Sequence, residues 1–198
     1  MSLAELEAHG FTVVPGPFAK HDMTAVAEAY DRAVLSAPPE TVRLSSSLRV
    51  SGFLARDPLF EFIAAFEPLL TACRAVIGKP FALSSMNART VLPGATAQPL
   101  HADVRRTENT WPLLSYILMI DPFTAENGAT RFVPGSHRDD RNPGEVMPDP
   151  SSRHERELLA CGDAGSMIIF HASVWHGFTA NRSPAPRRSV QGAFIPIV

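Results

Sequence analysis

Apolar residues in the first 80 positions recur mainly at helical spacing, and turn signals separate the periodic stretches. Gly10 follows the first stretch, Pro38 and Pro39 end the second, and a Gly-Lys-Pro sequence ends the third, which suits helix C-termini. The pattern predicts three helices, over residues 2–9, 21–35 and 58–77. It also predicts one short strand over residues 11–14. The Ser-rich residues 43–56 lack a clear period and predict a loop or an irregular strand.

From residue 81 the pattern changes to short apolar runs that proline and glycine interrupt. The runs predict strands over residues 81–92, 100–104, 113–120, 130–133, 166–170, 174–178 and 189–195. Turn signals between them favour antiparallel neighbours, whereas the polar, Pro-rich residues 138–156 predict a long mobile loop. We therefore expect a mainly β (α+β) fold, a double-stranded β-helix or cupin-like jelly roll with N-terminal helices packed on it.

Length and composition suit one globular domain over residues 1–198, with a mostly helical support at 1–80 and a β-roll core at 81–198. The chain is 45% hydrophobic and 19% charged, which excludes a disordered protein. Eighteen Lys and Arg against 20 Asp and Glu give a net charge of −2, so neither nucleic acid nor an anionic membrane is an expected partner.

Membrane and secretory signals are missing from the sequence pattern. The longest nearly apolar run, residues 113–120, is less than half a membrane span, and the first ten residues carry Glu5 and Glu7 without an apolar core. The two cysteines, Cys73 and Cys161, form no Cys-x-x-Cys pattern, so neither a disulfide framework nor a thiolate zinc site is expected. These features predict a cytoplasmic protein without membrane partners.

A His-x-Asp sequence at His101 and Asp103 is the first candidate for chemistry. Residues i and i+2 of a strand point to the same face, so one nitrogen and one oxygen can bind a single ion. A third ligand from another strand would leave the opposite octahedral positions open, as in non-haem Fe(II) oxygenases. His171 and His176 can both supply that ligand, and their spacing does not choose between them.

The His-x-Asp pattern is not specific by itself. Seven histidines and 20 acidic residues in 198 positions predict roughly 0.7 matches by chance. A second match, at His137 and Asp139, lies in turn-rich sequence where the same-face argument fails. Arg187 and Arg188 can be a solvated pair, or one of them can bind a carboxylate inside the roll.

Longer motifs give the sequence a specific resemblance. They are LEAHGFTVVPG at 6–16, QPLHAD at 98–103, ENGATRFVPGSH at 126–137 and GDAG at 162–165, which leads into WHG at 175–177. Asn181 and Arg187 follow five and eleven residues after His176. Nearly the whole chain thereby resembles the phytanoyl-CoA dioxygenase family of Fe(II)- and 2-oxoglutarate-dependent oxygenases.

The resemblance implies a function and a set of site residues. It implies that His101, Asp103 and His176, rather than His171, bind Fe(II), and that Arg187 holds the far carboxylate of 2-oxoglutarate. Oxygen would be the second cosubstrate, and a C–H bond of a small-molecule substrate would be oxidised, by default hydroxylated, with release of succinate and CO2. The carboxylate of Asp103 points to an oxygenase rather than a halogenase.

Some departures and alternatives accompany this interpretation. Where some family members have a serine that assists the arginine, this chain has Phe178. Either another hydroxyl, Thr90 or Ser115, assists the arginine, or the cosubstrate pocket is altered. Two alternative functions are a cupin-like metal-dependent isomerase or lyase that does not use 2-oxoglutarate, and a binding protein without turnover. Trp111 and residues 43–56 are candidates to line a substrate pocket, and a homodimer in which a second subunit covers the site is a further hypothesis.

Overall fold

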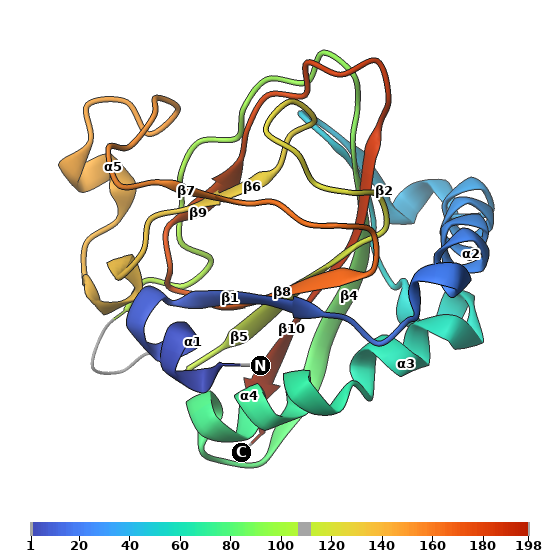
Figure 1. Ribbon diagram of the computed structural model, residues 1–198, viewed down its shortest axis with the longest axis horizontal. Helices are drawn as coiled ribbons and strands as arrows, with labels where there is room; N and C mark the ends of the chain where they lie inside the picture. The colour runs from blue at the N-terminus through green and yellow to red at the C-terminus, as the bar shows by residue number, and fades with distance from the viewer. Residues whose placement is uncertain (1, 107–111, 198) are drawn as a thin grey trace.

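The computed structural model describes residues 2–106 and 112–197, which form two antiparallel sheets that face each other (Figure 1). The larger sheet has seven strands in the order β1-β8-β5-β10-β4-β3-β2, and the smaller has three in the order β7-β6-β9. The strands are β1 (Phe11–Pro15), β2 (Val42–Leu44), β3 (Leu48–Val50), β4 (Phe81–Val91), β5 (Leu114–Met119), β6 (Thr130–Phe132), β7 (Leu158–Ala160), β8 (Ser166–His171), β9 (His176–Phe178) and β10 (Arg187–Pro196). This arrangement confirms the predicted jelly roll.

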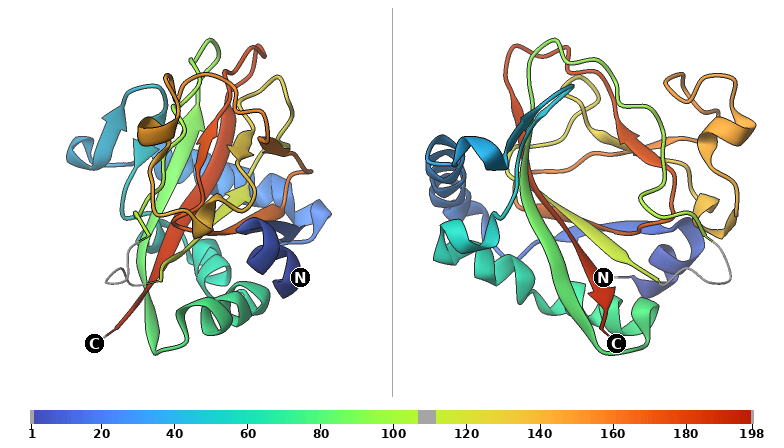
Figure 2. Two further views of the ribbon diagram at one scale, coloured as in Figure 1. Left: turned by 90° about the vertical axis from the view of Figure 1, so that its left-hand side faces the viewer. Right: turned by 180° about the vertical axis from the view of Figure 1, so that it is seen from behind.

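Helices from the first part of the chain cover the outer face of the larger sheet (Figures 1 and 2). The α-helices are α1 (Leu3–His9), α2 (Met23–Leu35), α3 (Glu61–Ala64), α4 (Glu67–Ile77) and α5 (Pro143–Val146), and the 3-10 helices are η1 (Lys20–Asp22), η2 (Pro39–Thr41), η3 (Leu54–Arg56), η4 (Pro58–Phe60) and η5 (Ser136–Arg138). No helix within the described ranges has the length and hydrophobicity that a membrane crossing requires.

Alternation along the central strands creates two separate cores. On β5, Leu114, Tyr116 and Leu118 face the helices and join the large outer cluster. Ile117 and Met119 point the other way and pack between the two sheets. The inner faces of β4, β5 and β10 therefore line the space between the sheets, where polar side chains can approach a small molecule.

The helix predicted over residues 58–77 is wrong in one respect, because it is interrupted. It divides into η4, α3 and α4, with an extended Phe66 between the last two. Pro68 explains the break: it has no N–H to donate to the carbonyl of Ala64, and its ring would clash with that carbonyl in a continuous helix. Pro68 instead occupies the first turn of α4, where proline is tolerated.

Several irregular segments also differ from the prediction. The short strand β7 was not predicted, and the segment 138–156 contains α5. Residues 43–56, predicted as a loop or an irregular strand, contain β3 and most of β2, which form a short hairpin. The predicted strand at 100–104 is an isolated bridge, in which His101 pairs with His176. The other six strands predicted after residue 80 correspond to β4, β5, β6, β8, β9 and β10. Short segments held by one or two bridges carry too weak a periodicity to be recognised from sequence.

Gly192 permits the close approach of β10 to its neighbours, and we expect Gly192→Ala to destabilise the protein. A Cβ atom at this position would collide with the carbonyl oxygen of Ser85 and with the hydroxyl of Tyr116, which lies opposite on β5. Overpacking of this kind costs about 1–3 kcal/mol, and we expect Tm to fall by roughly 3–10 °C in a thermal melt. Gly144→Ala is the control, since a Cβ there meets nothing within 4 Å. Equal Tm values for the two variants would contradict this account.

Candidate metal centre

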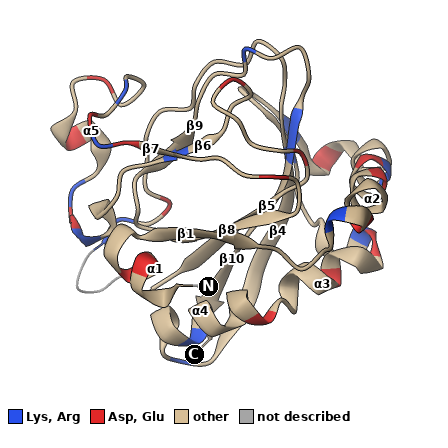
Figure 3. Cartoon of the chain, in the orientation of Figure 1, with Lys and Arg blue, Asp and Glu red and all other residues tan. Residues whose placement is uncertain are grey.

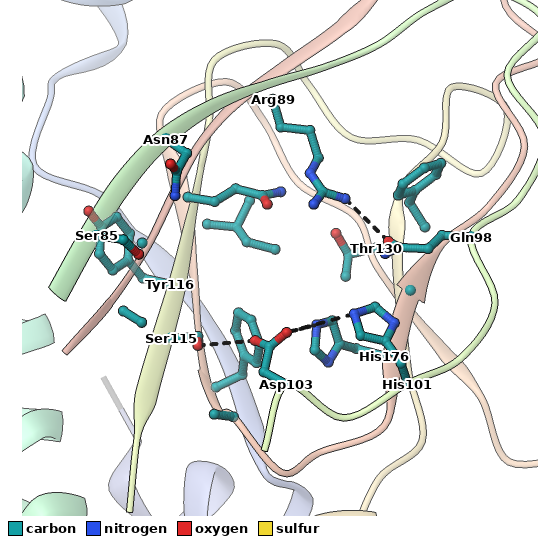
Figure 4. A pocket seen from close by; sticks show the side chains of 18 of the residues that line it. Ser85, Asn87, Arg89, Gln98, His101, Asp103, Ser115, Tyr116, Thr130 and His176 are labelled. Carbon is teal, nitrogen blue, oxygen red and sulfur yellow. Dashed lines mark hydrogen bonds and ion pairs between the residues drawn. The ribbon is translucent and has the colours of Figure 1, made fainter. Parts of the chain in front are cut away.

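The structure brings His101, Asp103 and His176 together at one end of the space between the sheets (Figure 4). One potential ligand atom from each residue lies within 4.8 Å of the other two. The backbone fixes this arrangement: the amide of His101 donates to the carbonyl of His176 at 3.0 Å, and the reverse bond measures 2.9 Å. Two distant segments are thus joined where the histidines lie, although 101–104 is not a regular strand.

Hydrogen bonds orient both imidazole rings toward the same point. His101 Nδ1 lies 3.0 Å from the carbonyl of Pro99, and His176 Nδ1 lies 2.9 Å from the carbonyl of Val174. A carbonyl only accepts, so each neutral ring carries its hydrogen on Nδ1 and has a free lone pair on Nε2. Each Nε2 lies 3.7 Å from Asp103 Oδ1. This geometry suits a divalent metal ion between the three side chains.

Burial and a hydroxyl complete the cluster. Burial lowers the pKa of His176 to about 4, only partly opposed by the charge of Asp103, so the ring is neutral near pH 7. Neutral imidazole is the form that binds metals. Ser115 on β5 donates to Asp103 Oδ2 at 3.4 Å. The residues present therefore fit a two-histidine, one-carboxylate metal site.

The other histidine and acidic candidates lie outside this cluster. His171 stacks on His137 with ring centroids 4.9 Å apart. Asp139 forms a bidentate pair with Arg141, in which the guanidinium lowers the pKa of the carboxyl to about 2. Geometry thus associates His176, and not His171, with His101 and Asp103.

Arg187 and Arg188 point to opposite faces of β10. Arg188 faces outward and pairs with Asp121 at 2.6 Å and with Asp31 of α2 at 2.7 Å. Arg187 faces inward, has no exposed surface and has no acidic partner among the described residues. Without the resemblance, the sequence did not decide which of the two arginines lies inside the roll. In the structure, successive side chains of β10 alternate between its two faces, so one arginine faces the cavity and the other faces the helices.

The guanidinium of Arg187 is an incompletely satisfied buried cation. Its Nη1 donates to Ser189 Oγ at 3.2 Å, and its Cζ lies 4.1 Å from the ring centroid of Phe123. Nε and Nη2 have no hydrogen-bond partner. Burial lowers the pKa of Arg187 to about 9, with a smaller contribution from Arg89. Because a buried charge without a partner is costly, this group is suited to an anion that enters the cavity.

The expected hydroxyl partner of Arg187 is corrected by the structure. Thr90 faces the helices and bonds Tyr30 of α2 at 2.9 Å, and Ser115 bonds Asp103. Ser189 contacts Arg187 instead. The sequence could have indicated Ser189 as this partner, because Ser189 lies two residues after Arg187 and side chains at positions i and i+2 of a strand share one face.

A cavity of about 260 Å³ connects the histidine–aspartate cluster with Arg187. Arg49, from the segment expected to line a substrate pocket, contributes to its wall. The remaining lining residues include Asn87, Arg89, Gln98, Thr130, Phe170 and Phe178. Trp111, the other candidate, lies outside the described residues.

The fold and the cluster together define a class: double-stranded β-helix proteins with two histidines and one carboxylate beside an open cavity. The sequence pattern of the phytanoyl-CoA dioxygenase (PhyH) family matches residues 6–189. The chain therefore belongs to this family, which confirms the resemblance drawn from its motifs and places it in a family of Fe(II)- and 2-oxoglutarate-dependent dioxygenases.

Curated relatives include two fungal dioxygenases. The dioxygenase cdmA of Talaromyces verruculosus is 38% identical over 116 residues, which cover 53% of this chain and 38% of that protein. The dioxygenase trt7 of Aspergillus terreus is 36% identical over 122 residues, which cover 56% of this chain and 41% of that protein. Each alignment thus spans less than half of the relative's length.

Solved structures share the fold at lower identity. EctD from S. alaskensis with bound Fe superposes with a TM-score of 0.81 and 18% identity, covering 98% of this chain and 75% of that one. HygX from Streptomyces hygroscopicus, with nickel, 2-oxoglutarate and hygromycin B bound, has a TM-score of 0.77 and 15% identity, covering 98% and 86%. At these identities the likeness supports the fold.

Proposed function

We propose that the protein is an Fe(II)- and 2-oxoglutarate-dependent dioxygenase that hydroxylates a C–H bond of a small organic molecule. One observation carries the proposal: a cavity holds both a cluster suited to Fe(II) and a buried, unpaired arginine. A metal site alone is common to many reactions. A metal site that shares its cavity with an unsatisfied guanidinium suits a cosubstrate that chelates the metal and carries a second carboxylate.

In this proposal His101, Asp103 and His176 would hold the Fe(II) ion through two imidazole nitrogens and one carboxylate oxygen. Bound Fe(II) would supply oxygen activation, so that O2, 2-oxoglutarate and R–H yield R–OH, succinate and CO2. The carbonyls of Pro99 and Val174 keep both Nε2 atoms directed at the metal position. Ser115 holds the carboxylate of Asp103 from the opposite side.

The remaining residues position the cosubstrate and exclude water. Arg187 binds the distal carboxylate through the N–H groups that have no partner in the protein. Ser189 and the ring of Phe123 fix the plane of its guanidinium. Phe170 and Phe178, both buried, contribute apolar wall near the cluster. Such a cavity strengthens electrostatic contacts and orients the substrate. The protein would contribute these effects, whereas the metal and the cosubstrate would supply the oxidative chemistry.

Family membership favours this function over the isomerase or lyase alternative, which has no use for Arg187. The fold hosts several outcomes in other proteins: one neighbour, SnoK, is described as a carbocyclase and another, SnoN, as an epimerase. Hydroxylation is the outcome we propose for this chain.

The proposal is tested by following carbon from the C1 carboxylate of 2-oxoglutarate in air. We expect Fe(II)-dependent release of labelled CO2 in equal amount to succinate, with an increase when a small-molecule library contains a substrate. Asp103→Asn supplies the inactive control. Oxygen uptake or substrate conversion that proceeds equally well without 2-oxoglutarate would contradict the proposal and favour a metal-dependent reaction of another type.

A further inference from the structure

Three arginines lie side by side across β2, β3 and β4. Arg43 is opposite Arg49, and Arg49 is opposite Arg89, in consecutive antiparallel registers. Like charges directly opposite each other in a sheet are destabilising. No ion pair with an acidic residue compensates Arg49 or Arg89 within the described ranges. The inner two of these arginines, Arg49 and Arg89, line the cavity.

Arg89 is the half-buried member of this pair, whereas Arg49 is exposed, and the guanidinium of Arg89 points into the cavity (Figure 4). Its guanidinium donates to a neutral amide, from Nη1 to Gln98 Oε1 at 3.3 Å, and its Cζ lies 5.7 Å from the ring centroid of Phe178. Nε is buried and unpartnered. Burial, and then the charge of Arg49, lower the pKa of Arg89. Like Arg187, this cation is incompletely satisfied by the protein.

The charges around the cavity do not balance. Arg49, Arg89 and Arg187 carry three positive charges, and Asp103 is the one acidic residue in the described lining. Fe(II) and doubly charged 2-oxoglutarate would add no net charge, so an excess of two positive charges would remain. The two carboxylates of 2-oxoglutarate are both assigned in the proposed function, one at the metal and one at Arg187. Arg49 and Arg89 are then left without an anion.

We propose that Arg89 and Arg49 bind an anionic group of the substrate, a carboxylate or a phosphate, and so select acidic substrates. This inference rests on the proposed function for the assignment of Arg187 and the metal. Arg89 would bind the oxyanion inside the cavity, and the exposed Arg49 would attract it at the rim. Figure 3 colours Lys and Arg blue and Asp and Glu red along the chain.

The test compares three probes of similar shape on the anaerobic Fe(II)- and 2-oxoglutarate-loaded protein: hexanoate, hexyl phosphate and the neutral hexanamide. We expect calorimetric titration to show at least one charged probe binding about tenfold or more tighter than hexanamide. Arg89→Met is expected to abolish this preference and Arg49→Gln to reduce it, whereas affinity for 2-oxoglutarate changes less than about threefold. Arg153→Gln removes a positive charge from an exposed side chain elsewhere and is the matched control.

Three results would overturn the inference. Equal binding of the three probes to the parent protein would show that the cavity does not select anions. Loss of 2-oxoglutarate binding in Arg89→Met would assign Arg89 to the cosubstrate. The same comparison in the metal-free Arg187→Met variant separates this inference from the proposed function. We expect the charge preference to survive there even if Fe(II) and 2-oxoglutarate fail to bind together, and its loss would identify Arg187 as the anion site.

Discussion

Arg187→Met is expected to make the ligand-free protein more stable and to prevent it from holding 2-oxoglutarate. Methionine removes a buried cation that has two unpartnered nitrogen atoms and no ion pair with an acidic residue in the described part of the chain. Replacing uncompensated buried charge with an apolar side chain of similar size stabilises by about 1–3 kcal/mol. Loss of the charge partner weakens binding of the dicarboxylate by at least about 30-fold.

Thermal melts measure both effects. Anaerobic Fe(II) with 2-oxoglutarate should raise the Tm of the parent protein by mass action, whereas the Tm of Arg187→Met starts higher and responds little. Arg188→Met is the matched control on the outer face. It breaks the pairs with Asp121 and Asp31, so it should lower the starting Tm and keep the response to 2-oxoglutarate. A destabilised Arg187→Met that still responds fully would refute the role of Arg187.

Asp103→Asn is expected to abolish turnover and to weaken iron binding by on the order of 100-fold or more. The amide preserves the size of the side chain, but it removes the negative charge that lies 3.7 Å from both Nε2 atoms. Iron content after desalting and succinate formation measure the two losses.

The second His-x-Asp sequence supplies the control for that experiment. Asp139→Asn breaks a pair with Arg141 on the surface and leaves the candidate metal cluster intact. We expect it to retain iron and turnover close to the parent values. If Asp103→Asn kept its iron while Asp139→Asn lost it, the metal would bind at His137 and Asp139. The assignment to His101 and Asp103 would then be wrong.

Much of the fold could be predicted because its main strands and helices carry their own periodic pattern. The strand pattern over 81–92 and 189–195 predicted β4 and β10, and Gly10 ended α1 as expected. The pattern failed where tertiary contacts or one residue override periodicity. Pro68 divides a helix that otherwise looks continuous, and the short strand β7 has two exposed leucines that give no inward-facing signal.

The candidate site divides in the same way. The pair His101 and Asp103 is visible in the sequence because its members are two residues apart. The match with His176 depends on a long-range bridge, so residue spacing alone could not choose it over His171. Arg187 and Arg89 form no ion pair with an acidic residue among those that the structure describes, and they keep unpartnered guanidinium nitrogens. These features depend on tertiary contacts, which no local pattern records. The homodimer remains a prediction from the sequence.

The most direct test of the central claim is an anaerobic titration of the purified metal-free protein with Fe(II) and then 2-oxoglutarate, followed by visible absorption. Chelation of Fe(II) by the keto acid produces a metal-to-ligand charge-transfer band. We expect this band in the parent protein and in Asp139→Asn, no band in Asp103→Asn, and a need for far more 2-oxoglutarate in Arg187→Met. Iron that binds to the parent protein without producing the band on addition of 2-oxoglutarate would contradict the account.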